Sequence, residues 1–192
     1  MIPPIDLNKK YGIMLSGGLD SAVLFYLLIQ EEPKIQLQPF TINKSDGAAR
    51  YANPIIEHFN KKFNLNIPNT IYVGDPTVHH RSQSKTAAID IFANHPVDHL
   101  FIGINQNPPE LDHLPGAPLR DKRSTDPRII FPFVDMYKTD IIDLMFKHNQ
   151  EDLIYITHSC TEQSVGRCNR CWQCTERAWS FSRLAREDNG LL

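Results

Sequence analysis

The stretch YGIMLSGGLDS, residues 11–21, decides the fold of this chain. Its apolar half, Tyr11–Leu15, ends in a Ser/Gly turn, which is typical of a short buried β-strand. Asp20–Gln30 follows with a nearly continuous apolar stretch that stops before Pro33, so we expect a helix there. A buried strand that leads through a tight turn into a helix begins a strand–helix–strand unit and predicts an α/β protein.

The alternation of strand and helix continues along the chain. Further strands are predicted at residues 35–42, 70–73, 100–104 and 129–133, and further helices at 48–63, 85–93, 139–148 and after Cys174. This order predicts an open, mostly parallel five-stranded sheet with helices on both faces. Ligands of such sheets bind beyond the carboxyl ends of the strands. The segments expected at that edge are 16–21, 41–50, 74–85, 103–126 and 135–138.

Composition and charge exclude several classes of protein. The chain has 192 residues, of which 41% are hydrophobic, enough for one domain with a small appendage. The net charge of −2 argues against a strongly basic nucleic-acid coat protein. The longest apolar run, Ala22–Ile29, is much shorter than the ~20 residues of a membrane helix. Met1–Lys10 lacks the charged-then-apolar order of a signal peptide, so we expect a cytoplasmic protein.

The turn after the first strand has the chemistry of a phosphate-binding loop, although a turn that only caps the helix is the plain alternative. Glycines let the backbone approach an anion closely, and the free N–H groups at a helix start attract its charge. Serine hydroxyls can donate further hydrogen bonds, whereas the acidic Asp20 is better suited to hold Mg²⁺ or to cap the helix. The string is neither a Walker A loop nor G-x-G-x-x-G. The residues expected to bind the nucleotide are Ser16, Gly17, Gly18, Leu19, Asp20 and Ser21.

All four cysteines lie in one short segment: Cys160, Cys168, Cys171 and Cys174. Four thiolates complete a tetrahedral shell around Zn²⁺ and leave no open position, so such a zinc would be structural. Two disulfides are disfavoured by the tight spacing and the expected compartment. An iron–sulfur cluster is the stronger alternative, because C-x₂-C-x₂-C runs also bind such clusters. The spacing therefore predicts a metal site, with zinc preferred.

The Ser-Gly-Gly-Leu-Asp-Ser string resembles the pyrophosphate loop of the N-type ATP pyrophosphatase (PP-loop) superfamily. Together with the cysteine spacing, it resembles the 7-cyano-7-deazaguanine (preQ0) synthase family over residues 11–185, nearly the whole chain. Lys138 after Phe131–Phe133 and the string Thr157–Cys160 are similar to family landmarks, and Arg81 stands where the family has a Pro-Gly-Arg-Asn turn. The resemblance implies an adenine nucleotide alpha hydrolase-like fold, ATP with Mg²⁺, and a structural Zn²⁺.

The resemblance also implies an ATP-dependent carbon–nitrogen ligase. Such an enzyme adenylates the carboxylate of 7-carboxy-7-deazaguanine and aminates it with ammonia to the amide and then the nitrile, in queuosine biosynthesis. Residues 79–82 and 105–126 depart from the family pattern, and both fall where the acceptor would be recognised. Two alternatives stay open: a PP-loop enzyme that modifies a tRNA base or a protein amine, and a nucleotide-binding protein without turnover.

Three residues are predicted to act in catalysis. Asp20 would help to hold Mg²⁺, Lys138 would neutralise charge that develops on a phosphate or acyl-adenylate oxygen, and Arg81 would contact phosphate. The plain alternative for Lys138 and Arg81 is a solvated surface side chain. Weaker candidates are His79, His80, Arg50, Glu110 and Asp112.

We divide the chain into an ATP-binding α/β domain, residues 1–156, and a zinc-binding segment with its C-terminal helix, residues 157–192. The expected partners are the deazapurine carboxylate and ammonia. No membrane partner is expected, and the near-neutral charge argues weakly against nucleic acid. The sequence leaves a homodimer open.

Overall fold

The computed structural model describes residues 2–42, 44, 47–74, 80–118, 120 and 124–190, apart from the side chains of residues 80–82 and 84. The strands are β1 (Lys10–Met14), β2 (Gln36–Ile42), β3 (Ile71–Val73), β4 (His99–Ile102) and β5 (Ile129–Ile130). The helices are α1 (Leu19–Glu31), α2 (Ala52–Phe63), α3 (His80–Asn94), α4 (Lys138–Lys147), α5 (Leu153–Ile156) and α6 (Trp172–Arg183). A 3₁₀ turn, η1 (Ala48–Tyr51), leads into α2.

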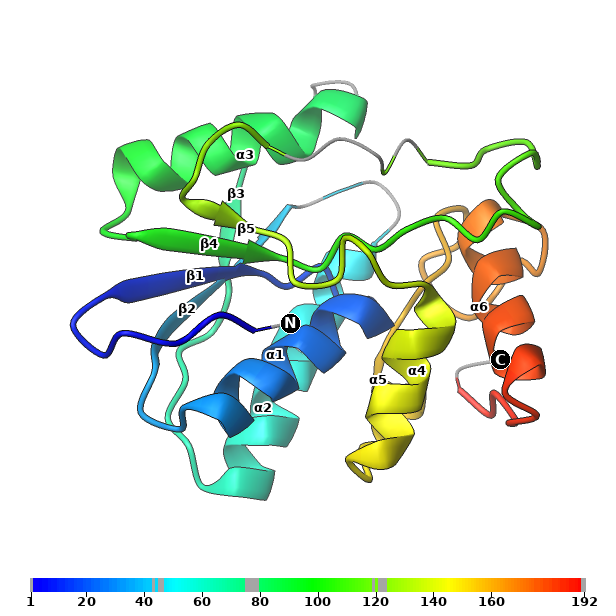
Figure 1. Cartoon of the computed structure of the whole chain (residues 1–192), viewed down its shortest axis with the longest axis horizontal. Helices are drawn as coiled ribbons and strands as arrows, with labels where there is room; N and C mark the ends of the chain where they lie inside the picture. Colours follow the sequence, from blue (N-terminus) through cyan, green and yellow to red (C-terminus); the bar gives the residue numbers. More distant parts are fainter. Residues whose placement is uncertain are drawn as a thin grey trace.

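The five strands form one sheet in the order β3-β2-β1-β4-β5 (Figure 1). Every neighbouring pair in this described sheet is parallel. The chain moves from β1 towards one edge and then returns to place β4 on the other side of β1, so the direction of strand order reverses there. Open α/β sheets bind their ligands at such a switch point. The predicted open parallel sheet is therefore confirmed. Because β1 is its central strand, residues 16–21, which follow β1, lie at the middle of the edge where ligands bind.

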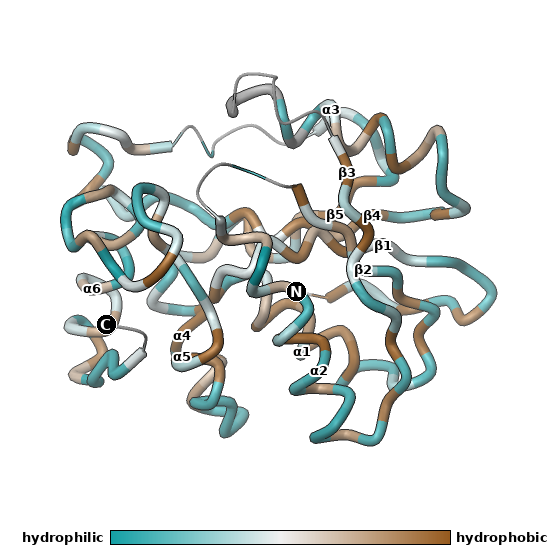
Figure 2. The backbone as a smooth tube through the Cα atoms, turned by 180° about the vertical axis from the view of Figure 1, so that it is seen from behind, coloured by the Kyte–Doolittle hydropathy of each residue, from teal (hydrophilic) through white to brown (hydrophobic). Residues whose placement is uncertain are grey.

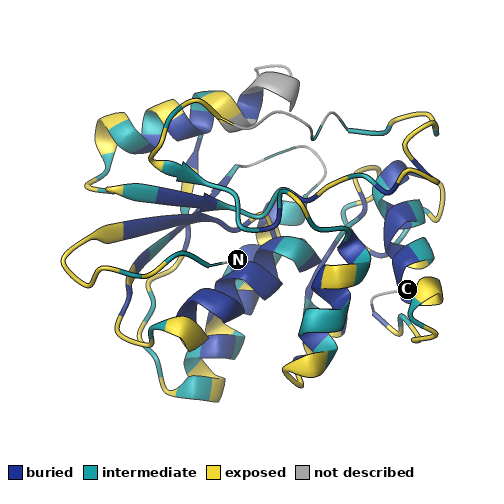
Figure 3. Ribbon diagram, in the orientation of Figure 1, coloured by how far each residue is buried: buried dark blue, intermediate teal, exposed yellow. Residues whose placement is uncertain are grey.

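Helices cover both faces of the sheet, and each face has its own apolar cluster (Figures 1 and 3). Tyr11 and Ile13 of β1 belong to the larger cluster, which includes buried residues of α1, α2 and α4. Met14 belongs to the smaller cluster, which includes Ala87 and Ile91 of α3. This division follows from the alternation of side chains along a strand. Helix α1 is buried along nearly its whole length and is coloured mostly as hydrophobic in Figure 2.

Several elements differ from their predicted bounds. Strand β5 contains only Ile129–Ile130, because Pro132 has no N–H for a sheet hydrogen bond and the chain turns, with the Val134 N–H donating to the Phe131 carbonyl. Helix α3 begins at His80 instead of residue 85, since its first turn is polar and gives no apolar period.

The C-terminal part also differs from prediction in detail. Helix α6 begins before Cys174, with Cys171 as its N-cap residue in an extended conformation. The single turn α5 was not predicted, because so short an element shows no periodicity. Phe181 of α6 belongs to the large cluster beneath the sheet, and its ring lies edge-on to Phe146 of α4 at 6.3 Å between centroids.

The division of the chain after residue 156 stays a prediction. Among the described helices, none has the length and apolar character that crossing a membrane requires.

Candidate active site and metal centre

Glycine is required at position 17 of the predicted phosphate loop. Gly17 has φ of +84°, and a Cβ atom there would lie 2.1 Å from the carbonyl oxygen of Ala48 in η1. Gly18 is the N-cap residue of α1 and has an ordinary φ of −86°. Glycine has no side chain that could accept hydrogen bonds from the first N–H groups of α1. Those N–H groups therefore stay available to bind an anion.

Ser16 and Ser21 hold this loop closed from within. The Ser16 N–H donates to Ser21 Oγ at 3.2 Å, and the two hydroxyl oxygens are 3.1 Å apart. The Ser21 hydroxyl also donates to the Gly18 carbonyl at 3.0 Å. Ser21 is buried whereas Ser16 is exposed, so Ser21 shapes the loop and Ser16 remains accessible to a ligand.

The segment that follows α5 is fastened to the loop through His158. Its N–H donates to the Gly17 carbonyl at 2.9 Å, and its ring stacks on Tyr51 with centroids 4.8 Å apart and an interplanar angle of 4°. His158 Nε2 lies 2.8 Å from the Gln163 carbonyl oxygen. The loop at the start of the chain and the segment leading to the cysteines therefore form one contiguous structure.

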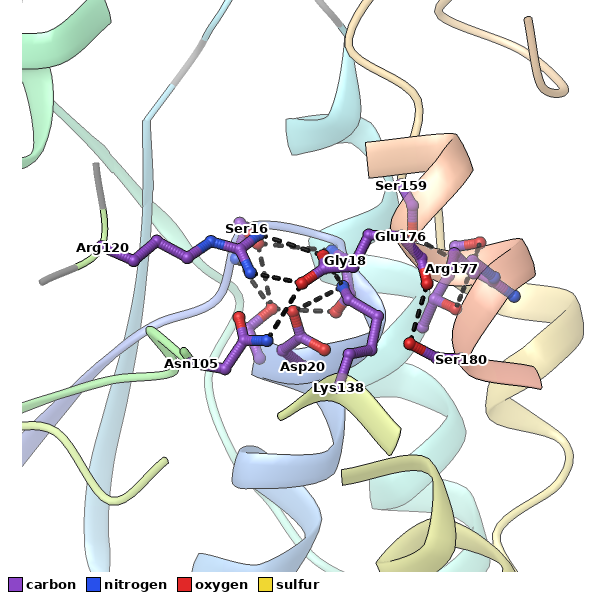
Figure 4. A network of polar contacts seen from close by, with 12 residues as sticks. Ser16, Gly18, Asp20, Asn105, Arg120, Lys138, Ser159, Glu176, Arg177 and Ser180 are labelled. Atoms are coloured by element: carbon purple, nitrogen blue, oxygen red, sulfur yellow. Dashed lines mark hydrogen bonds and ion pairs between the residues drawn. The ribbon is translucent and has the colours of Figure 1, made fainter. Parts of the chain in front are cut away.

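Lys138 meets Asp20 at the end of the sheet (Figure 4). The ammonium Nζ of Lys138, at the start of α4, lies 2.8 Å from Asp20 Oδ2 in the first turn of α1. Lys138 is only 4% exposed, which excludes the alternative of a solvated lysine. Asp20 Oδ1 is also buried and has no hydrogen-bond partner among the described residues. One carboxylate oxygen thus fixes the lysine while the other is left for a ligand.

A second carboxylate completes the network around Lys138. Glu176 of α6 is fully buried, and its Oε2 lies 3.1 Å from Lys138 Nζ. Arg120 binds the same carboxylate through two nitrogens, at 2.5 and 3.1 Å. The Asn105 amide donates to Glu176 Oε1 at 3.3 Å. Two cations and two carboxylates therefore balance one another beside the phosphate loop, as buried charges require.

Arg177, the next residue of α6, points into a different network. It is 1% exposed, and its guanidinium contacts Asp188 and the hydroxyls of Thr157 and Ser159. Burial alone would raise the pKa of Asp188, but hydrogen bonds and positive charge from Arg177 and Arg167 outweigh it and hold that pKa below its usual range. Burial lowers the pKa of Arg177 in turn. Through Arg177, this network links Asp188 near the C-terminus to Thr157 and Ser159, the residues before and after His158.

The four cysteine sulfurs form a compact group, in which all lie within 4.8 Å of one another. A tetrahedral zinc with Zn–S bonds of about 2.3 Å needs sulfurs about 3.8 Å apart, so small movements would complete such a site. Backbone N–H groups point at two of the sulfurs, from Gln163 to Cys160 at 3.3 Å and from Cys171 to Cys168 at 3.2 Å. Such outer contacts orient thiolate ligands. The donor set fits a closed metal site.

The pKa values of these thiols are shifted in different directions. Burial opposes ionisation of Cys171, but hydrogen bonds from Thr161 and Cys174 outweigh it and lower its pKa to about 7. Burial and the neighbouring Cys171 raise the pKa of Cys174, and burial also raises that of Cys168. A bound cation would hold all of them as thiolates, because its charge reverses these shifts.

The remaining predicted residues are either exposed or have side chains outside the described set. Arg81 lies in the first turn of α3, and its side chain, like that of His80, is outside the described set; His79 is outside the described residues. Arg50 and Glu110 are exposed. The exposed Asp112 accepts a hydrogen bond from the Asn107 amide at 2.8 Å, which serves the loop itself.

Glu176, Arg120 and Asn105 were not predicted as site residues. They come from distant parts of the sequence, and none belongs to a motif. Arg120 also lies over the Trp172 ring at 4.6 Å, and the Trp172 indole N–H donates to the Leu111 carbonyl at 3.3 Å. The signal in the sequence for Asn105 and Arg120 was that residues 103–126 follow a strand at its carboxyl end, whereas nothing in the sequence pointed to Glu176.

Fold and loop together define the class: an open, parallel α/β fold with a glycine loop between the central strand and the first helix. NMN synthetase from Francisella tularensis has this fold in common with the chain, with a TM-score of 0.56 and 14% identity over 93% of this chain and 78% of that one. At that identity the similarity establishes the fold alone.

Two further solved structures are more distant. A U34-tRNA thiolase from Methanococcus maripaludis with its [4Fe-4S] cluster gives a TM-score of 0.43 at 17% identity, over 74% of this chain and 57% of that one. FMN adenylyltransferase from Candida glabrata, in complex with FMN and an ATP analogue, gives 0.45 at 18%, over 74% and 50%. The chain thus spans about half the length of these two proteins. No family model and no curated protein matches the sequence.

Proposed function

We propose that this protein is an ATP-dependent ligase that adenylates a carboxylate, with 7-carboxy-7-deazaguanine as the acceptor and ammonia as the nitrogen donor. The observation that carries the proposal is the contact between Lys138 and Asp20, which are 118 residues apart in the sequence and meet beside a loop that requires glycine at position 17. The acceptor and the amination rest on the resemblance of the loop and the cysteine spacing to the 7-cyano-7-deazaguanine synthase family.

The residues at the loop fit ATP with Mg²⁺. The β and γ phosphates would lie against residues 16–21, where the glycine backbone and the start of α1 favour an anion. The unpartnered Oδ1 of Asp20 suits a hard cation that prefers oxygen ligands. When bound, Mg²⁺ neutralises charge on the departing pyrophosphate.

The protein's contribution would be positioning and charge stabilisation. An acceptor carboxylate oxygen bonds to the α-phosphorus, the bond from that phosphorus to the bridging oxygen breaks, and pyrophosphate leaves. Ammonia then attacks the acyl carbon, AMP leaves, and a proton passes to solvent, which gives the amide. In the second round the amide oxygen bonds to the α-phosphorus of another ATP and pyrophosphate leaves; the C–O bond then breaks, AMP leaves, and both nitrogen-bound protons pass to solvent, which gives the nitrile. Lys138 stabilises the negative charge in both adenylation steps.

The cysteine site would hold a structural Zn²⁺. Four protein thiolates leave no coordination position for a substrate, so the ion would serve the fold and take no part in the chemistry. Its place supports that role, because Cys160 follows His158, which holds the loop, and Cys174 precedes Glu176, which contacts Lys138.

The experiment is a pyrophosphate-release assay with ATP, Mg²⁺, ammonia and 7-carboxy-7-deazaguanine, followed by mass spectrometry of the product. We expect release that depends on the acceptor, and an amide or nitrile product. ATP binding without release from this acceptor would reject it, and a salt-dependent gel shift with tRNA would favour a nucleic-acid acceptor instead.

Asp20→Ala separates the loop from the fold. We expect turnover at least ~100-fold lower than in the wild type, because an interaction with the transition state is lost, while circular dichroism stays unchanged. Turnover near that of the wild type would contradict the assignment of the loop.

A further inference from the structure

We propose that Glu176 is a positioning residue, which holds Lys138 and Arg120 together so that both cations serve the anion bound at the phosphate loop. This inference rests on the proposed ATP site. No motif in the sequence marks either Glu176 or Arg120, and the resemblance assigns neither of them a role.

The first argument is the geometry of the carboxylate. Glu176 is 0% exposed, yet three donors from three segments converge on it: Lys138 of α4, Arg120, and Asn105 after β4 (Figure 4). Helix α6 thereby contributes the one carboxylate that all three of these side chains contact. A carboxylate that accepts from both a lysine and an arginine sets the position of one relative to the other.

The second argument is electrostatic. Lys138 is 4% exposed, and the Arg120 side chain is 14% exposed, so neither charge is fully solvated. Two cations this close repel each other, and burial adds to the cost. Asp20 contacts only Lys138 among these cations in the described part of the chain, so Glu176 is the group that compensates Arg120. Without it, Arg120 would move towards solvent and leave the site.

The third argument is how α6 itself is anchored. Cys171 is the N-cap residue of the helix and Cys174 lies in its first turn, so two of the four clustered sulfurs lie at the end that carries Glu176. Trp172 packs under Arg120 from the same turn. The carboxylate is thus held by a rigid support, as positioning residues need to be.

The test uses calorimetry to measure the affinity for three ligands: ATP, Mg²⁺-pyrophosphate and adenosine. The proteins compared are the wild type, three single variants and one double variant: Glu176→Gln, Glu176→Asp, Lys138→Gln and Glu176→Gln/Lys138→Gln. Adenosine is the matched control, because it lacks the anion. We expect Glu176→Gln to weaken ATP and pyrophosphate about 10- to 100-fold, the range found for outer partners that orient a ligand, and to leave adenosine within about twofold. Glu176→Asp keeps the charge and should recover part of the loss.

A purely structural role predicts different results. If Glu176 acts through Lys138, the double variant loses less affinity than the product of the two single effects. Equal weakening of adenosine and pyrophosphate, or fully multiplicative effects, would overturn the inference. If Glu176→Gln does not fold, Arg120→Gln tests the same point, since it should weaken pyrophosphate and spare adenosine; an unchanged pyrophosphate affinity would then reject it.

The two proposals fail in distinguishable ways. A wild type that binds ATP and pyrophosphate, with variants that bind both equally well, overturns only the role of Glu176. A wild type that binds neither ligand overturns the proposed ATP site and the inference with it.

Discussion

Residues 11–21 and residues 157–190 meet at the same edge of the sheet, but different forces hold them. The first segment is fixed by its own backbone: a buried strand, a glycine with φ of +84° and a buried helix. Among its described residues the second has one helix, α6, and it depends on side-chain contacts such as those of Arg177 with Asp188. The first segment should therefore form from local sequence, whereas we expect the second to depend on the proposed metal and on its ionic network.

Loss of one cysteine should break the second segment most severely. For Cys174→Ser we expect metal content to fall from about one ion per chain to near zero, because three thiolates and a hydroxyl hold zinc poorly and structural zinc contributes on the order of 10 kcal/mol. Metal analysis and limited proteolysis within residues 157–190 measure the effect. A brown protein with iron and sulfide would instead show an iron–sulfur cluster.

Arg170→Gln is the matched control for that variant. Arg170 also lies between the cysteines, but it is largely exposed and pairs with Glu162 at the surface. Surface pairs contribute about 0–1 kcal/mol, so metal content and proteolysis should match the wild type. Metal loss in this control would show that the segment is fragile towards any change.

Gly17→Ala should break the first segment through its backbone. The left-handed φ costs a side chain about 1–2 kcal/mol, and the contact with the Ala48 carbonyl adds more, so we expect a loss of roughly 2–4 kcal/mol in unfolding free energy. Urea unfolding measures this. Gly18→Ala is the control for stability, because φ there is ordinary and a Cβ atom would meet its nearest neighbours at 3.4 Å. Equal losses for both variants would contradict the backbone argument.

The smallest expected effect is a change with pH in the stability that the ionic network of residues 157–190 contributes. Asp188 has a folded pKa below its ordinary value of 3.8, so its contribution to stability is present above pH 3.8 and is lost as the pH falls through the folded pKa. Asp188→Asn removes this contribution. We expect the difference in melting temperature between wild type and variant to be constant near neutral pH and to shrink below about pH 4. A difference that does not change with pH would mean that charge is not what Asp188 contributes.

The sequence predicted those features that are local. Residues 11–21 carried the strand, the loop and the helix start in one stretch, and the cysteine spacing indicated a metal site. It missed Glu176 and Arg120, because a buried carboxylate in a helix and an arginine in a long loop look like surface residues in a linear pattern. From the sequence, Lys138 could be either a site residue or a solvated surface lysine. Its burial and its contact with Asp20 decide against the solvated lysine.

The sequence by itself determined the α/β class, the position of the phosphate loop and the group of four thiols, because each depends on neighbours within a few residues. Only the tertiary structure decided that Lys138, Asp20, Glu176 and Arg120 form one network and that His158 joins the cysteine segment to Gly17. The physical reason is that buried charges must find partners wherever the fold brings them together. Those partners come from α1, α4, α6 and a loop that the chain order keeps far apart.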